Sequence, residues 1–168
     1  MTTSLTNSEI QYNYDDNHRM ISWVDGNGNT VITNEYDNNN RVVKQVDANG
    51  VITTLKYDDG ETTTIDGNGN ATVYKYDSLY RTTSIKYADG TTEEMLYKNN
   101  ELHSKTDRNK LKYTYMYNDN GDVIKETRYD GKSKEYEYQK NGKRVKEIDF
   151  NGNVTKYSYD IKGNLIEI

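Results

Sequence analysis

The sequence lacks several residue types that usually define a protein's chemistry. Its 168 residues include no cysteine and no proline, and phenylalanine and tryptophan occur once each. Without cysteine the chain has no disulfide, no thiolate nucleophile and no cysteine-bound metal. No apolar run approaches the roughly 20 residues of a membrane helix, and residues 1–10 lack the basic start and apolar stretch of a secretory signal. We therefore expect no membrane insertion and no signal peptide in this chain.

Apolar residues and positive charge are also scarce. Hydrophobic residues make up 32% of the chain, and 17 tyrosines supply a large part of them. The formal net charge of −5 lacks the basic footprint of a nucleic-acid-binding protein. So little aliphatic surface would suit a disordered chain, but the tyrosines are placed periodically. This periodicity indicates a folded protein. The negative net charge predicts that the protein does not bind nucleic acid.

The most informative pattern is a tyrosine followed by a small polar, acidic or basic residue. It recurs at separations of 19 to 22 residues along the whole chain, and a second tyrosine often precedes it by two positions. We interpret these tyrosines as the structural anchors of an internal repeat. The eight anchors are Tyr14, Tyr36, Tyr57, Tyr76, Tyr97, Tyr117, Tyr138 and Tyr159.

Two turn-forming clusters divide each repeat into segments of strand length. One cluster follows the anchor and leads to an arginine or a substitute, as at Arg19, Arg41 and Arg81. The other lies half a repeat later and contains Asp-Gly or Asn-Gly, which favour hairpins with type I′ turns. Between the clusters, residues alternate with the two-residue period of strands, as in 112–117. The anchor tyrosines are expected to be more buried than the threonines and lysines between them.

These elements predict an all-β fold. We expect about eight hairpins of about 21 residues, or about sixteen short strands, in one continuous antiparallel meander. The sheet should curve into a spiral, an open shell or a partial barrel. Residues 1–11 are interpreted as a lead-in segment and residues 12–168 as a single repeat domain.

The repeat resembles the YD repeat of the Rhs family. The segments 36–41, 76–81 and 159–164 carry the Tyr-Asp-x-x-Gly-Arg pattern best. Members of that family include polymorphic toxins, cocoon subunits of insecticidal toxin complexes and teneurins. The resemblance implies a β-shell or adhesive scaffold that is secreted or exposed at the cell surface.

A non-catalytic structural module is therefore the predicted function, with no enzyme activity and no cofactor. The alternative is a carbohydrate-binding repeat module whose exposed tyrosine rows stack on sugars. The sequence assembles no catalytic triad around His18 or His103. We expect no metal site, because clusters such as 25–29 and 66–70 lack the bidentate glutamate of a calcium loop and are explained by turns.

The C-terminal segment is apolar and prone to form a strand. Residues 164–168 read Asn-Leu-Ile-Glu-Ile, and an unpaired edge strand invites pairing. We therefore expect residues 165–168 to pair with another strand. The partner is the first repeat of the same chain, a second copy in a homo-oligomer, or a further repeat of a longer parent protein. A glycan, bound by the exposed tyrosine rows rather than by this segment, is the other partner considered.

Overall fold

The computed structural model describes residues 9–168, so most of the lead-in segment predicted at residues 1–11 lies outside it. These residues form two compact units. The first runs to Tyr80 and also includes Lys86–Gly90; the second consists of Arg81–Ile85 and Thr91–Ile168. No helix occurs in the part of the chain that is described, and no segment of it qualifies as a membrane-crossing helix. The all-β prediction is therefore confirmed.

The strands of the first unit follow one another in chain order. Each is hydrogen-bonded to the next without a crossover, and the pairs are antiparallel. The seven strands are β1 (Gln11–Tyr14), β2 (Met20–Val24), β3 (Thr30–Tyr36), β4 (Val42–Asp47), β5 (Ile52–Asp58), β6 (Glu61–Ile65) and β7 (Ala71–Tyr76).

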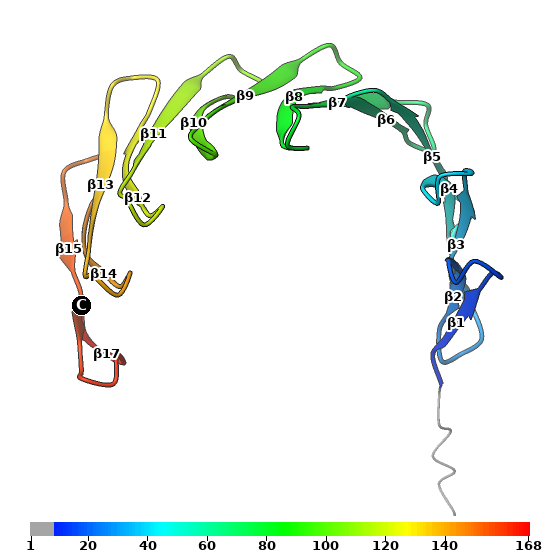
Figure 1. The fold of residues 1–168 in the computed structure, drawn as a ribbon, viewed down its shortest axis with the longest axis horizontal. Coiled ribbons are helices and arrows are strands. Elements are labelled where there is room, and N and C mark those ends of the chain that lie inside the picture. The colour runs from blue at the N-terminus through cyan, green and yellow to red at the C-terminus, as the bar shows by residue number, and fades with distance from the viewer. Residues whose placement is uncertain (1–8) are drawn as a thin grey trace, which may run out of the picture. The chain divides into compact units, whose positions relative to one another are not determined.

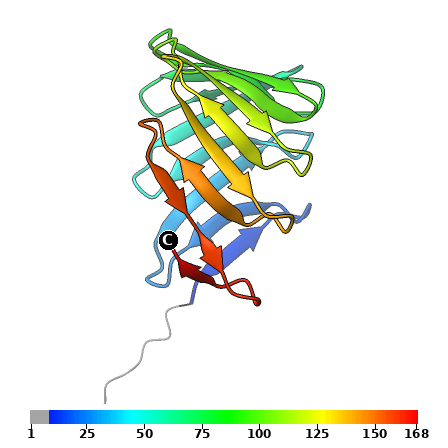
Figure 2. The same cartoon turned by 90° about the vertical axis from the view of Figure 1, so that its left-hand side faces the viewer.

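The second unit repeats the same topology, and Figure 2 shows its later strands side by side, coloured yellow to red. The meander continues with β8 (Thr82–Lys86), whose last residue belongs to the first unit, β9 (Thr92–Lys98), β10 (Glu101–Thr106), β11 (Lys112–Tyr117), β12 (Val123–Thr127), β13 (Ser133–Tyr138), β14 (Arg144–Ile148) and β15 (Val154–Lys156). A separate pair consists of β16 (Ser158–Tyr159) and β17 (Leu165–Glu167). Within residues 9–168, β1 and β15 end the pairing order, so the meander is not closed into a barrel.

Each unit is a single layer of strands, and no second layer covers either of its faces (Figure 1). Among the described residues no hydrophobic side chain is fully buried. The anchor tyrosines from Tyr36 to Tyr159 are half-buried, whereas Tyr14 in β1 is 57% exposed. The sheet is therefore held together by neighbouring strands rather than by a core between layers.

The turns differ from the predicted type. In most hairpins a three-residue loop is closed by two backbone hydrogen bonds, as between Asp25 N–H and the Asn29 carbonyl (2.9 Å) and between Gly28 N–H and the Asp25 carbonyl (3.0 Å). Only the last loop residue has positive φ, for example 85° at Gly28. This is a type I turn followed by a left-handed bulge residue. Two consecutive positive φ values, as a type I′ turn requires, occur at Asn99 and Asn100.

Candidate functional site: contacts between consecutive repeats

An aspartate organises the turn after several anchors, as Asp15 does after Tyr14. Asp15 Oδ1 accepts hydrogen bonds from the backbone N–H groups of Asn17 (2.9 Å) and Arg19 (3.0 Å). Its Oδ2 accepts from Arg19 Nε (2.7 Å), and Arg19 Nη2 lies 2.7 Å from the same atom. These bonds hold the pKa of Asp15 below its usual value, chiefly through the Arg19 side chain. The aspartate thus closes the turn and fixes the direction of the arginine.

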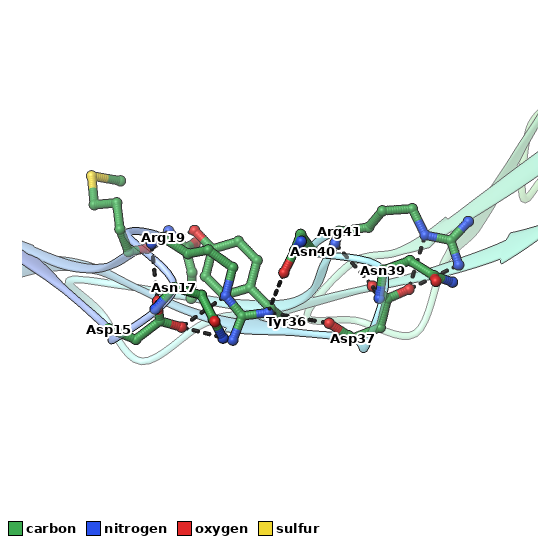
Figure 3. Close-up of polar contacts among 10 residues, drawn as sticks. Asp15, Asn17, Arg19, Tyr36, Asp37, Asn39, Asn40 and Arg41 are labelled. Carbon is green, nitrogen blue, oxygen red and sulfur yellow. Dashed lines mark hydrogen bonds and ion pairs between the residues drawn. The ribbon is translucent and has the colours of Figure 1, made fainter.

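The arginine then contacts the next repeat (Figure 3). The Arg19 guanidinium lies 4.7 Å from the ring centroid of Tyr36. Its Nη1 also donates to the Asp37 carbonyl (3.2 Å) and to Asn40 Oδ1 (3.0 Å). A cation over an aromatic ring stabilises by about 0.5–1 kcal/mol at an exposed position. Equivalent stacking joins Arg41 to Tyr57, Arg81 to Tyr97, and Lys143 to Tyr159.

The tyrosine contacts the preceding repeat through its hydroxyl group. Tyr14 pairs with Met20 at a register shift in the β1–β2 ladder, and such a bulge disrupts the regular ladder bonds. The Met20 carbonyl accepts hydrogen bonds from the Tyr36 hydroxyl (2.7 Å) and from Asn34 Nδ2 (3.0 Å). A polar group at the bulge is therefore satisfied by the next repeat.

This arrangement recurs in both units. In each case the residue opposite one anchor tyrosine accepts, through its carbonyl, the hydroxyl of the next anchor at 2.7 to 2.9 Å. The acceptor and donor pairs are Val42 and Tyr57, Leu102 and Tyr117, Val123 and Tyr138, and Arg144 and Tyr159. Burial raises the pKa of Tyr57, Tyr117 and Tyr138. We call the arginine stacking and the hydroxyl bond together the repeat clamp.

The opposite face of the strands carries ion pairs between neighbouring strands. Lys44 Nζ lies 2.7 Å from Glu35 Oε1, and these residues are directly opposite in the ladder. Lys146 and Glu137 are paired in the same way at 2.7 Å. Such exposed pairs contribute about 0.2–1 kcal/mol each. Both faces therefore use their side chains to join strands.

The shortened third repeat departs from the clamp. Asp58 pairs directly with Glu61 around the two-residue loop Asp59–Gly60, which leaves no position for the stacking arginine. Tyr76 is instead linked by its backbone, whose N–H donates to the Gly60 carbonyl at 2.8 Å. Among residues 9–168, no cation is stacked over the ring of Tyr76, and the same holds for Tyr117 and Tyr138.

In the turns that lie half a repeat after the anchors, aspartates accept backbone hydrogen bonds as Asp15 does. Asp25 Oδ1 accepts from the N–H groups of Asn27 (2.9 Å) and Asn29 (2.8 Å), and the Asn29 side chain lowers the pKa of Asp25. Asp66 makes the equivalent bonds with Asn68 and Asn70. Within residues 9–168 no three acidic or histidine side chains gather as they would around a metal ion. Asp25 and Asp66, from the two clusters compared with calcium loops, are engaged in turn hydrogen bonds.

The sequence indicates the arginines but not their targets. Arg19 precedes Tyr36 by 17 positions, and only the hairpin register brings the two side chains together. The hydroxyl acceptors carry no sequence signal, since they are backbone carbonyls of different residue types. Lys143 replaces arginine at the same place, which the spacing of its turn from Tyr138 would have indicated.

The comparisons with known proteins agree with this repeat. Residues 14–52 match the family model described as RHS Repeat. No curated protein matches the sequence. The crystal structures of TcdB2-TccC3 and of TcdB2-TccC3-Cdc42 are both similar to this chain with a TM-score of 0.76, at 16% and 15% identity. Each match covers 93% of this chain and 10% of that chain.

A third structure, TcdB2-TccC3 without its hypervariable C-terminal region, gives a TM-score of 0.51 at 12% identity, covering 94% of this chain and 12% of that one. The chain thus spans about one tenth of the length of the structures that it matches. The predicted resemblance to the Rhs repeat is confirmed over residues 14–52 by the family model. The structural matches, at 15–16% identity, show a shared fold over most of the chain.

Proposed function

We propose that this chain is a non-catalytic structural module, a scaffold segment built from YD repeats. The observation that carries the proposal is the repeat clamp. The anchor tyrosines and the arginines, which are the most regularly repeated side chains, make contacts with the neighbouring repeat. The recurring aspartates are engaged in turn hydrogen bonds rather than directed toward a common point. The eight anchor tyrosines therefore act as structural residues.

The likeness to TcdB2-TccC3 supports a more specific role for the module. Those chains are about ten times longer than the matched segment, so this chain corresponds to a short stretch of such a structure. We propose that it forms part of the shell of a toxin-delivery or surface-exposed protein, with residues 12–168 acting as one domain. This role places it next to further repeats of a parent protein.

Duplication of one repeat tests the scaffold function. A second copy of residues 37–57 inserted after Tyr57 adds one complete hairpin and one clamp. In a repeat scaffold the longer chain folds, its urea m-value rises with the added buried surface, and its unfolding midpoint is at least maintained. Trp23, the only tryptophan, reports unfolding by fluorescence, and circular dichroism reports the whole chain. In a single domain the two transitions coincide.

The matched control inserts only residues 37–46, which is half a repeat. This insertion shifts the order of strands and turns, so it should lower the midpoint and broaden the transition. If the complete repeat were as damaging as the half repeat, the scaffold proposal would be wrong. Separate transitions for the two probes would contradict the single domain.

We further propose that the module self-associates through its last strand. Leu165 lies opposite Tyr159 at a register shift, the position held in earlier repeats by the carbonyl that accepts the next anchor hydroxyl. Leu165 and Ile166 are exposed, and so is Tyr14 in the first strand. A second copy can therefore offer Tyr14 to the Leu165 carbonyl, head to tail.

A further inference from the structure

The third repeat supplies no cation for the ring of the anchor that follows it. In the clamp, the arginine five positions after one anchor stacks over the ring of the next, as Arg41 does at 4.3 Å from the Tyr57 centroid. The step from Tyr57 to Tyr76 is 19 residues, whereas the preceding step is 21. The chain is shortened around the loop Asp59–Gly60, and Thr62 stands where the arginine would be. Tyr76 thus presents a ring whose usual partner is missing.

This ring forms one wall of a hollow. The hollow has a volume of about 290 Å³, and its lining includes the rings of Tyr57, Tyr76 and Tyr80. An adjoining hollow of about 300 Å³ shares Gly60, Tyr76 and Tyr80 with it. We call the two together the Tyr76 hollow. Because small-molecule sites begin at roughly 300 Å³, the Tyr76 hollow has room for a long side chain.

Tyr80 is held at this hollow in an unfavourable backbone conformation. Its φ is 59°, in the left-handed region that glycine and asparagine adopt most readily. Its side chain is 88% exposed, so packing within the chain does not require a tyrosine here. Backbone strain of this kind is a reason to look for a function. The same place in other turns is held by His18, Asn40, Gly121, Gly142 and Gly163.

The charges around the Tyr76 hollow favour a cation. Arg41 is the basic side chain of its lining, and the acidic ones are Asp58, Asp59, Glu61 and Asp77. The charge of Arg41 is matched by Asp37, 2.8 Å away. Glu61 lies 3.7 Å from Lys75. Asp58 and Asp59 are exposed at the loop, so their carboxylates keep the hollow negative and would repel an anion.

The other two anchors without a stacked cation have different surroundings. Beside Tyr117 is a smaller hollow of about 240 Å³, in whose lining Lys98 balances the charge of Glu101. Tyr138 lines neither that hollow nor the Tyr76 hollow. An uncovered anchor ring, a second aromatic ring and an excess of carboxylates therefore come together at Tyr76.

We propose that the Tyr76 hollow binds the guanidinium group of an arginine in a partner polypeptide. The guanidinium stacks on the ring of Tyr76 beside Tyr80, and its N–H groups donate to the carboxylates of Asp58 and Asp59. The partner thus supplies the cation that Arg41 supplies to Tyr57 within the chain. Arginine suits the place better than lysine, because its planar group stacks on rings and carries five donors. The proposal does not depend on the scaffold function.

The test is a titration of the full chain with the peptide acetyl-Gly-Arg-Gly-amide, followed by the amide NMR signals of Gly60, Tyr76 and Tyr80. The same peptide with citrulline in place of arginine is the ligand control, because citrulline has a similar shape and no charge. The arginine peptide should bind at least about tenfold more tightly than the citrulline peptide. Equal binding of the two peptides would overturn the proposal. So would an absence of shifts up to roughly 50 mM arginine peptide.

A loop replacement supplies the missing cation within the chain. Exchanging residues 58–62 for a copy of residues 37–43 restores the 21-residue step and places an arginine as Arg41 is placed in the second repeat. Its guanidinium should cover Tyr76, so the peptide should bind at least about tenfold more weakly, while the melting temperature is maintained or raised. Undiminished binding to the folded loop variant would contradict the proposal.

Two single substitutions test the lining without changing the loop length. Asp59→Asn should weaken peptide binding about two- to fivefold, as expected for one exposed charge. Asp16→Asn is the matched control, because Asp16 is also exposed and also lies two positions after an anchor; it should leave binding unchanged. Tyr80→Asn should weaken binding and keep the fold, since asparagine tolerates positive φ. Equal losses for Asp59→Asn and Asp16→Asn would mean that only net charge attracts the peptide, against the proposal.

Discussion

At the scale of single residues, the anchor tyrosine has two separable roles. Its ring covers the strand and accepts a cation over its face, as Tyr57 does with Arg41. Its hydroxyl donates to a carbonyl in the preceding repeat, 2.7 Å away at Val42. The ring contributes through area and stacking, whereas the hydroxyl satisfies a backbone acceptor at a bulge. Substitutions that remove only one group can therefore measure each role.

Tyr57→Phe removes the hydroxyl and keeps the ring. The Val42 carbonyl then loses its donor in a half-buried position, and one hydrogen bond of this kind is worth about 0.5–1.5 kcal/mol. We expect the free energy of unfolding, measured in urea, to fall by about 1 kcal/mol. Tyr129→Phe is the control: its exposed ring makes an edge contact with Tyr113, and it should change stability by less than about 0.5 kcal/mol. Equal effects in the two variants would show that the clamp hydroxyl contributes nothing.

The turn aspartates make the protein sensitive to acid. Hydrogen bonds from Arg128 lower the pKa of Asp130 to about 2, and Asp15, Asp25, Asp37 and Asp66 are shifted in the same direction. Unfolded aspartate has a pKa of about 3.9, so the unfolded chain binds more protons below this pH. The stabilising effect of these ionised aspartates is fully present above the pKa of aspartate in the unfolded chain. It is lost as the pH falls through the lower pKa values of the folded protein.

The melting temperature, measured from neutral pH downward, should therefore be nearly constant to about pH 5 and then fall steeply between about pH 4 and pH 2. Asp130→Asn removes one of the shifted carboxyl groups, so its melting temperature should fall less over that interval. An acid loss that begins near pH 6 would contradict the assignment to these aspartates.

At the scale of the hairpin, the left-handed residue determines the turn. Gly28 has a φ of 85°, and a β-carbon added there meets no atom within 4 Å. Any cost of a side chain at this position is therefore conformational. The same position is held by His18, Asn40, Tyr80 or Lys110 in other turns. The fold tolerates these residues, but each should strain its turn more than glycine does.

Gly28→Ala tests this directly. Alanine in the left-handed region costs about 1–2 kcal/mol, partly offset by its smaller loss of chain entropy. We expect a net loss of about 1 kcal/mol in the free energy of unfolding. Gly28→Asn should cost clearly less, since asparagine adopts positive φ more readily than alanine. A larger loss for asparagine than for alanine would mean that side-chain size, and not φ, determines the loss of stability at this position.

The sequence predicted the hairpins well because the tyrosine spacing and the alternation of strand residues follow directly from backbone geometry. The turn type predicted from the sequence was wrong for most hairpins. Asp25-Gly26 resembles a type I′ pair, but the Asp25 carboxylate accepts from residues two and four positions later, which requires a three-residue loop. The pairing of Arg19 with Tyr36 was also not predictable, because it depends on register across a whole repeat.

At the scale of the whole molecule, the proposed self-association concerns the strand β17. β17 pairs with β16 of the same repeat, which is none of the predicted partners. The pairing of residues 165–168 with the first repeat, a second copy or a further repeat stays a prediction. Ile166 is 65% exposed, and an exposed edge strand can add a further strand. Association through this edge would use the same backbone groups as pairing between repeats.

Ile166→Lys tests association through β17. A charged residue on an edge strand opposes further pairing, so light scattering at micromolar concentration should show a smaller mean mass than for the unchanged chain. Ile161→Lys is the control, because Ile161 is fully exposed in the turn before β17 and lies outside the strand. If both substitutions reduced the mass equally, general hydrophobic contact would be responsible. A monomeric unchanged chain would contradict self-association.

The clamp's use of carbonyl acceptors has a consequence for how such sequences diverge. Every residue type carries a carbonyl, so the acceptor position imposes no side chain; methionine, valine, leucine and arginine all occupy it here, at Met20, Val42, Leu102 and Arg144. The clamp itself therefore requires only the tyrosine and the turn, and it leaves the side chain at each acceptor position free to differ.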